Sequence, residues 1–172
     1  MPIFLCNITI PRGGAWSPNG TILFSPHSDK GLYTIPSTGG DPKPETELDA
    51  AKGDTTHRFP FFFPNGRDYL FLSFGMKGEQ QGIEMRTLGG KDRNRIVGGE
   101  GAIFIPPDIM LYQMNGKLHA QRFDVQEKRL KGDAKILAES LWQDYTIGGT
   151  LGFSATQDLL VCWIRDIRSR PV

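Results

Sequence analysis

His57 and Arg58 form the pair of side chains in this sequence best suited to binding a charged ligand. They stand directly before an aromatic run at residues 61–63 that is predicted to be a buried strand. Arg12 holds the corresponding place before another predicted strand at residues 15–16. Guanidinium groups bind anions through paired hydrogen bonds, so Arg12, His57 and Arg58 are candidate binding residues for an anionic or peptide ligand. The alternative is that the arginines bind loop carbonyls or pair with aspartates of a neighbouring structural unit.

No catalytic or metal-binding motif accompanies these residues. A serine hydrolase would need a Gly-x-Ser-x-Gly turn, and Ser140 and Ser154 lack the flanking glycines. Two cysteines and three scattered histidines do not supply the closely spaced ligands of a zinc site. The glycine-rich loop, the catalytic loop and the Asp-Phe-Gly motif of protein kinases are also absent. We therefore expect no catalytic residue, no metal and no cofactor in this chain.

The elements that must position the candidate residues recur along the chain. An aromatic residue, a turn and an apolar run appear four times, with leading aromatics at Trp16, Phe62, Phe104 and Phe153. The turns of the first three copies contain Pro-Asn-Gly, Pro-Asn-Gly and Pro-Pro-Asp. Such a turn between two β-branched or aromatic runs predicts an antiparallel hairpin. The copies are 46, 42 and 49 residues apart (16 to 62, 62 to 104, 104 to 153), which is the repeat length typical of β-propeller blades.

Two further strands follow the hairpin in each of the first three copies. In the second copy they are predicted at residues 82–88 and 94–97, where apolar and polar residues alternate with a period of two. The sequence therefore predicts an all-β propeller fragment of about three and a half four-stranded antiparallel blades. The predicted blades span residues 12–49, 55–98 and 100–139, and an incomplete blade spans 147–167. Residues 3–10 are predicted to be the outer strand of a preceding blade.

This count leaves the ring open, because propellers generally close with four to eight blades. Either residues 3–10 pair with the incomplete blade, or a second copy completes a ring of seven to eight blades, or a longer parent protein supplies the rest. We expect a homo-oligomer for the isolated chain, because open strand edges and apolar faces promote association. Cys6 and Cys162 are either two buried small apolar residues or a disulfide where the ring closes.

Composition is that of an ordinary soluble globular chain. Charged residues make up 23% and hydrophobic residues 38%, while 21 Gly and 12 Pro fall between the apolar runs, as expected of many turns. A net charge of +1, from 20 basic and 19 acidic residues, gives no electrostatic argument for a nucleic acid partner. No run approaches the length of about 18 apolar residues that a membrane span needs.

Residues 12–98 resemble the WD-like propeller repeats of the TolB type. The resemblance rests on Arg12 to Phe24, on His57-Arg58-Phe59-Pro60 and on Phe63 to Leu70, and it continues more weakly to the end of the chain. More narrowly, these segments are similar to the propeller region that follows the kinase domain in acidobacterial serine/threonine protein kinases. That family usually has Asp where this chain has Asn19 and Asn65, and both residue types fit such a turn.

The resemblance implies a non-catalytic scaffold, the sensory or interaction part of a larger bacterial signalling protein related to these kinases. It would bind a protein, a peptide or a small ligand at the mouth of the central channel, near Arg12, His57 and Arg58. If the parent is a membrane-anchored kinase, this part is expected outside the cytoplasm or in the periplasm. The alternative is an accessory propeller of a peptidase or another enzyme whose catalytic domain lies elsewhere.

Overall fold

The computed structural model describes residues 4–75, 81–142 and 151–165. Over these residues the protein consists of antiparallel β-sheets and one short 3-10 helix. This confirms the prediction of an all-β chain for the part of the chain described. The short helix η1 (Ala50–Lys52) ends at Gly53, which adopts a left-handed conformation (φ 71°) that glycine accepts at low cost.

Three sheets have four strands each, and in every one the strands pair in chain order. The first contains β1 (Gly14–Trp16), β2 (Thr21–Phe24), β3 (Tyr33–Pro36) and β4 (Lys43–Pro44). The second contains β5 (Asp54–Phe62), β6 (Asp68–Gly75), β7 (Gly82–Thr87) and β8 (Asn94–Val97). The third contains β9 (Gly101–Ile105), β10 (Ile109–Met114), β11 (Lys117–Asp124) and β12 (Arg129–Ala138).

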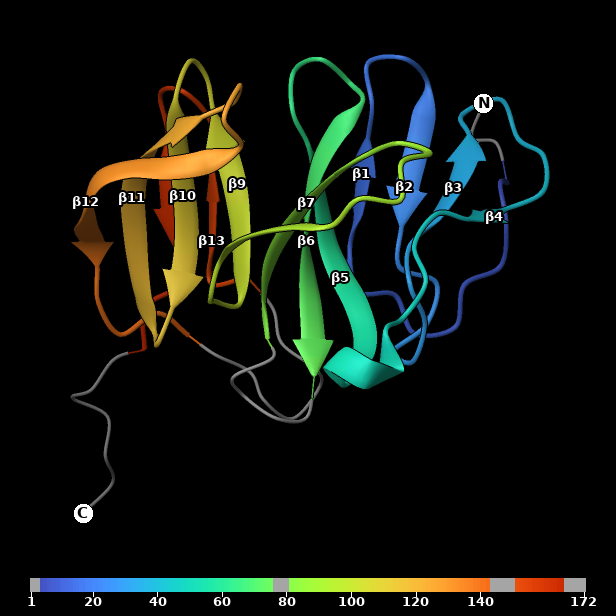
Figure 1. Cartoon of the computed structure of the whole chain (residues 1–172), viewed down its shortest axis with the longest axis horizontal. Coiled ribbons are helices and arrows are strands. Elements are labelled where there is room, and N and C mark those ends of the chain that lie inside the picture. The colour runs from blue at the N-terminus through green and yellow to red at the C-terminus, as the bar shows by residue number, and fades with distance from the viewer. Residues whose placement is uncertain (1–3, 76–80, 143–150, 166–172) are drawn as a thin grey trace.

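A fourth sheet has two strands, β13 (Phe153–Ala155) and β14 (Leu160–Cys162). Figure 1 shows the first three sheets side by side in chain order, with β13 behind the third sheet in that view. The sheets fall within the predicted blade ranges, except that β5 begins one residue before residue 55. The division of the chain into these blade domains remains a prediction.

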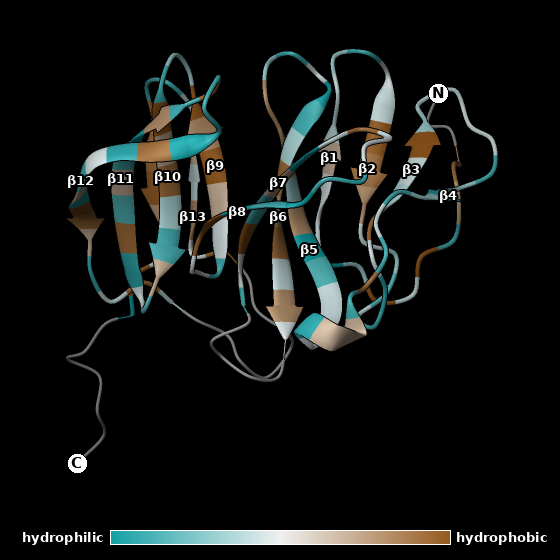
Figure 2. Cartoon of the chain, in the orientation of Figure 1, coloured by the Kyte–Doolittle hydropathy of each residue, from teal (hydrophilic) through white to brown (hydrophobic). Residues whose placement is uncertain are grey.

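The sheets pack face to face through three apolar clusters. The largest lies between the second and third sheets and includes Phe63, Leu70 and Met85 on one side and Phe104 and Phe123 on the other. A second cluster joins the first two sheets, and a third joins the third sheet to β13. Because side chains alternate along a strand, β6 contributes to two clusters, and Figure 2 shows the hydrophobic segments concentrated in the strands.

The repeated turns hold adjacent sheets together as well as reversing the chain. Gly20 and Gly66 have positive φ angles of 80° and 66°, which the Asn-Gly turns require. The Ser17 hydroxyl of the first turn donates a hydrogen bond to the carbonyl of Gly66 in the second (2.7 Å). A side chain at position 66 would approach Ser17 Oγ and Asn19 Nδ2 to 2.8 Å. Glycine is therefore needed there for two independent reasons.

The strand predicted at residues 3–10 is not formed over the described residues 4–10. This segment lies over Phe24, Pro26 and Tyr33 of the first sheet, and the backbone N–H of Thr9 donates to the Pro26 carbonyl (3.3 Å). It does not pair with β14, which is paired with β13. A lone extended segment becomes a strand only beside a free sheet edge, and this segment lies over loop and face residues instead.

Candidate functional site

The three predicted binding residues lie at the junction of the first and second sheets. Arg12 precedes β1, as predicted. His57 and Arg58 were predicted to stand before a strand, but they lie inside β5. The N–H of Phe59 donates to the Arg12 carbonyl (2.8 Å), which ties the two segments together. Phe59 has a positive φ of 49°, and the pairing register of β5 shifts between Arg58 and Phe61. A bulge of this kind redirects the side chains next to it.

Arg12 and Arg58 bring two positive charges together. The Arg58 guanidinium is 4.1 Å from the centre of the Phe74 ring, and the residue is 6% exposed. Burial, together with the positive charge of Arg12, lowers the pKa of Arg58 to about 10. Arg12 donates to the Pro11 carbonyl (3.4 Å), while its buried Nε has no hydrogen-bond partner among the described residues. None of the ion pairs between described residues involves Arg12, so the alternative of an aspartate partner does not hold for it.

His57, in contrast to the two arginines, is enclosed by protein groups. Its ring is fully buried and lies edge-on to Phe71, with 4.8 Å between the ring centres. Its Nδ1 is 2.7 Å from Thr46 Oγ1, and its Nε2 is 3.3 Å from Asp54 Oδ2. Both ring nitrogens are therefore occupied by the protein. Adjacent residues of a strand point to opposite faces, which explains why His57 does not join Arg58 in a common site.

Thr46, His57 and Asp54 have the residue types of a catalytic triad. Thr46 Oγ1 accepts the N–H of Leu32 (2.7 Å), so its own hydrogen is available to Nδ1 of His57. The hydrogen-bond pattern then assigns the ring hydrogen to Nε2, which faces Asp54. Thr46 is only 3% exposed and His57 is fully buried, so no substrate can reach the hydroxyl. The arrangement links the first sheet to the second rather than activating a nucleophile.

Asp54 is the centre of a larger buried polar network. Its carboxylate accepts hydrogen bonds from Ser73 Oγ (2.7 Å), from Arg93 Nη1 (2.7 Å) and from the backbone N–H of Asp49 (3.0 Å). Burial alone raises the pKa of Asp54, but the hydrogen bonds from His57, Arg93, Ser73 and Asp49 lower it well below the ordinary range. The carboxylate is therefore charged at neutral pH although its side chain is 2% exposed.

Arg93 completes this network through a second carboxylate. Its Nε and Nη2 donate to the two oxygens of Glu84, at 2.5 and 2.7 Å, in a bidentate arrangement. Hydrogen bonding to Glu84 and then to Asp54 raises the pKa of Arg93 above its ordinary value against the opposing effect of burial. This network was not predicted from the sequence. Its one visible signal was Ser73, a polar residue within the mostly apolar strand β6.

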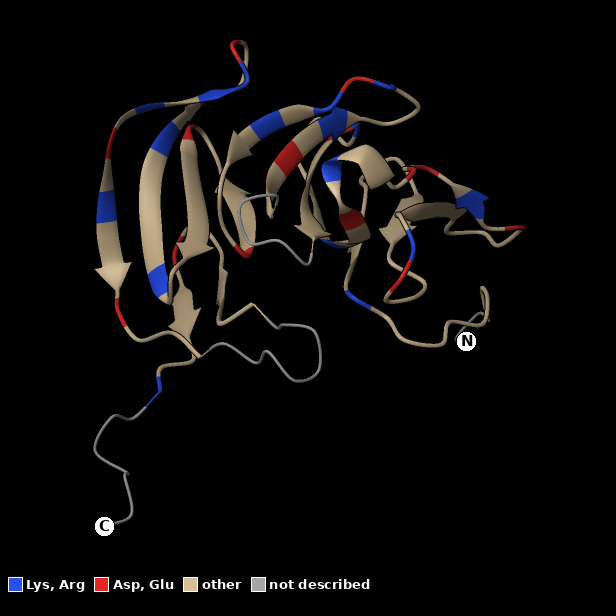
Figure 3. Ribbon diagram, turned by 60° about the horizontal axis from the view of Figure 1, so that its bottom comes forward, with Lys and Arg blue, Asp and Glu red and all other residues tan. Residues whose placement is uncertain are grey.

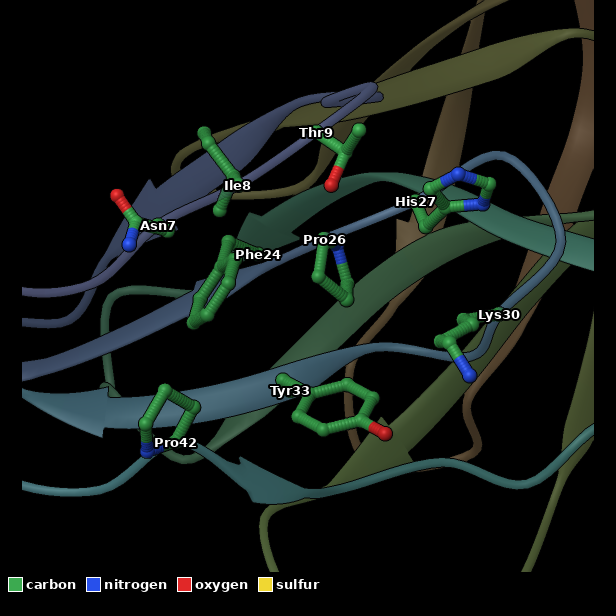
Figure 4. Close-up of a pocket in the computed structure, with 9 residues that line it drawn as sticks. All are labelled: Asn7, Ile8, Thr9, Phe24, Pro26, His27, Lys30, Tyr33 and Pro42. Atoms are coloured by element: carbon green, nitrogen blue, oxygen red, sulfur yellow. The ribbon is translucent and has the colours of Figure 1, made fainter.

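A small hollow of about 260 Å³ lies over the first sheet, beneath the segment that precedes Arg12. Figure 4 shows Ile8, Phe24, Pro26 and Tyr33 along this hollow, with His27 at one end. His27 Nδ1 is 2.6 Å from the carboxylate of Asp29 and is not directed to any cluster of ligating groups among the described residues. The hollow is mainly apolar and resembles a packing surface more than a chemical site.

Three features that bear on the wider predictions are visible in the described part of the chain. Cys6 and Cys162 are both free thiols, so they do not form the disulfide that was one of the two alternatives. No three potential metal ligands gather within the described ranges. Among the same residues, no helix is long and apolar enough to cross a membrane. Figure 3 shows basic and acidic residues interspersed over the ribbon rather than gathered on one face.

The comparisons with known proteins define the fold class as a β-propeller. TolB from Acinetobacter baumannii matches with a TM-score of 0.53 and 19% identity, over 73% of this chain and 31% of that chain. The β-propeller domain of the Trilobed protease from Pyrococcus furiosus, described as having an open velcro topology, matches with a TM-score of 0.55 and 9% identity, over 78% of this chain and 45% of that chain. No protein-family model matches the chain, and no curated protein is significantly similar to it.

These matches confirm the predicted β-propeller fold. They show the fold alone, because both identities are low. The chain spans less than half the length of either structure.

Proposed function

We propose that this chain is a non-catalytic propeller scaffold, and that Arg12 and Arg58 bind a carboxylate-bearing peptide or small molecule. The observation that supports the proposal most directly is the buried Nε of Arg12, which has no hydrogen-bond partner among the described residues. Arg12 is tied to the segment that carries Arg58 by the hydrogen bond from the Phe59 N–H to the Arg12 carbonyl. An anionic ligand at this junction would give Arg12 Nε its missing acceptor.

The proposal keeps two of the three residues named from the sequence. His57 has a supporting role, because its buried hydrogen bonds to Thr46 and Asp54 fix the strand that carries Arg58. The Thr46 hydroxyl is the best-placed nucleophile of the network around His57, and it is buried. A substrate could not reach it, which agrees with a binding role rather than a catalytic one. The chain would neither transfer phosphate nor hydrolyse peptides.

We also propose that the chain acts as the interaction part of a larger protein. The resemblance to the propellers of acidobacterial serine/threonine kinases favours a bacterial signalling context. The match to a protease propeller domain favours the second candidate, an accessory propeller of a peptidase. The reading frame upstream of Met1 discriminates between them, because kinase or peptidase motifs encoded there would identify the catalytic partner.

The binding proposal is tested with a fluorescently labelled peptide of alternating Glu and Gly residues, by fluorescence anisotropy at low salt. Wild-type protein is expected to bind it, and Arg12→Gln is expected to weaken binding by about tenfold, the effect of one lost charge-assisted hydrogen bond. Arg67→Gln is the matched control, since Arg67 is an exposed arginine of the second sheet's first turn. Equal binding of the peptide by wild type, R12Q and R67Q would refute the site, as would equal binding of a Gln-Gly peptide.

A further inference from the structure

A second candidate site lies in a groove of about 590 Å³ between the first and second sheets. One wall is the segment from Pro44 to Ala50, which leads from β4 into η1. The other wall is formed by Arg86 of β7 and by the residues from Gly89 to Arg93 that follow it. Pockets that hold small molecules commonly have volumes of about 300–1,000 Å³. The groove therefore has room for a ligand of two or three residues.

The two walls carry opposite charges. The first wall contributes Glu45, Glu47 and Asp49, and the second contributes Arg86, Lys91 and Arg93. No ion pair between described residues joins one wall to the other, although Glu45 Oε1 accepts the N–H of Gly89 across the groove (3.0 Å). The unlike charges are thus held apart, and a ligand can bridge them.

Four of these six charged groups already have protein partners, including Glu45, which accepts the Gly89 N–H, and Arg86, which donates to the Gly90 carbonyl. Asp49 accepts the N–H groups of Ala51 and Lys52 and so caps η1. Arg93 is held by the carboxylates of Glu84 and Asp54. Glu47 and Lys91, in contrast, are exposed and form no hydrogen bond or ion pair with other described residues. They are available to a ligand at little desolvation cost.

Arg86 is the residue that points most directly to a ligand. It is 7% exposed, one of its terminal nitrogens donates to the Gly90 carbonyl, and its buried Nε has no hydrogen-bond partner among the described residues. It lies opposite Tyr69 in the β6–β7 pairing, and the Tyr69 hydroxyl donates to Glu45 Oε1 (3.1 Å). A buried guanidinium with an unused donor in the lining of a groove is a strong site for a carboxylate.

We propose that this groove binds a zwitterionic ligand of dipeptide size, with its carboxylate at Arg86 and Lys91 and its ammonium group at Glu47. A simple anion fits less well, because it would face the carboxylates of the first wall without a compensating positive charge. This site is separate from the Arg12 and Arg58 pair, so its test is independent of the proposed function.

The test is isothermal titration calorimetry with the dipeptide L-alanyl-L-alanine, its N-acetylated form and its C-terminal amide. The zwitterion is expected to bind, and each blocked form is expected to bind about tenfold more weakly, since each loses one charged contact. No binding of the zwitterion at 20 mM, on the order of the weakest small-ligand affinities, would overturn the proposal. Equal affinity for all three dipeptides would overturn it as well.

Substitutions in the groove test whether the dipeptide binds there. Lys91→Gln and Glu47→Gln change exposed side chains and should each weaken binding of the zwitterion by about threefold to tenfold. Glu47→Gln should not change the affinity for the N-acetylated form, because that form has no ammonium group. Arg86→Gln should abolish binding, with its folding checked by circular dichroism. Lys135→Gln, an exposed change on β12, is the control. Unchanged affinity in K91Q and E47Q would show that the dipeptide binds elsewhere.

Discussion

Replacing Asp54 with Asn tests how much the buried polar network within the second sheet contributes to stability. The substitution keeps the shape of the side chain and removes its negative charge. Arg93 would keep its bidentate contact with Glu84 but would lose its charged partner at Nη1. In Asp54 the two carboxylate oxygens face Ser73 and His57 as hydrogen-bond acceptors. The Asn side chain has one acceptor oxygen and one NH₂ donor, so one of these two hydrogen bonds would lose its acceptor.

The expected loss in free energy of unfolding is about 3 kcal/mol. Removing one partner of a buried ion pair costs about 3–5 kcal/mol, because the remaining charge stays buried. The remaining Glu84 contact reduces the loss toward the lower end of this range, and Arg93, whose side chain is 13% exposed, can recruit some water. A typical domain is stable by about 5–15 kcal/mol, so the loss should be visible as a large shift of the unfolding midpoint.

The assay is urea unfolding at pH 7, followed by tryptophan fluorescence and by circular dichroism. Asp92→Asn is the matched control, because Asp92 is exposed and adjacent to Arg93, and it should change stability by less than about 0.5 kcal/mol. A loss below about 1 kcal/mol for Asp54→Asn would refute the reasoning, since it would show that the network contributes little net stability.

The stability difference between wild type and Asp54→Asn should depend on pH. Because the folded-state pKa of Asp54 is lowered, its stabilising contribution is fully present above the unfolded pKa, which is about 3.9 for Asp. The contribution is lost as pH falls below that value toward the folded pKa. The difference in stability between wild type and Asp54→Asn should therefore be constant from pH 7 to about pH 5 and should shrink at pH 3. A difference that grew on acidification would contradict the assignment.

Two further predictions concern contacts between repeats. Ser17→Ala removes the hydrogen bond to the buried Gly66 carbonyl and should lower the free energy of unfolding in urea by about 1–2 kcal/mol. Thr38→Ala, at an exposed turn position, is the control and should leave the free energy of unfolding almost unchanged. Equal losses in the two variants would show that the turn contact is unimportant. The isolated chain should self-associate through β14, where Val161 is 57% exposed, and Val161→Lys should lower its mass in light scattering over a dilution series. A wild-type chain that stays monomeric at all concentrations would contradict the expected closure by a second copy.

The repeats could be predicted from the sequence because their signals are local. A Pro-Asn-Gly turn and the alternating residues beside it lie within about ten positions of one another, and turn and strand preferences act over that distance. Residues 4–10 show the limit, because an apolar run becomes a strand only where a neighbouring edge is free.

The candidate site could be predicted only in part, because its contacts are not local. Arg93 meets Asp54 across 39 positions, and Thr46 meets His57 across a loop and a helix. A single sequence does not show which faces of two strands meet. Arg12 and Arg58 could be named together because they hold corresponding places in adjacent repeats, although Arg58 lies inside β5 rather than before a strand.

The junctions between sheets differ in the polar contacts that supplement their apolar packing. The junction of the second and third sheets is filled by a large apolar cluster, which would accept similar faces in several registers. The junction of the first and second sheets adds directional hydrogen bonds, from Ser17 to Gly66, from Tyr69 to Glu45 and between Thr46 and His57. A shift of one sheet against the other would leave these buried groups unpaired, at a cost of about 1–3 kcal/mol each. Because the turns of adjacent repeats are nearly identical, directional hydrogen bonds of this kind are needed to select one alignment of the two sheets. The same alignment positions Arg12 beside Arg58 and sets Glu47 opposite Lys91, so the specificity of packing and both proposed binding sites depend on one junction.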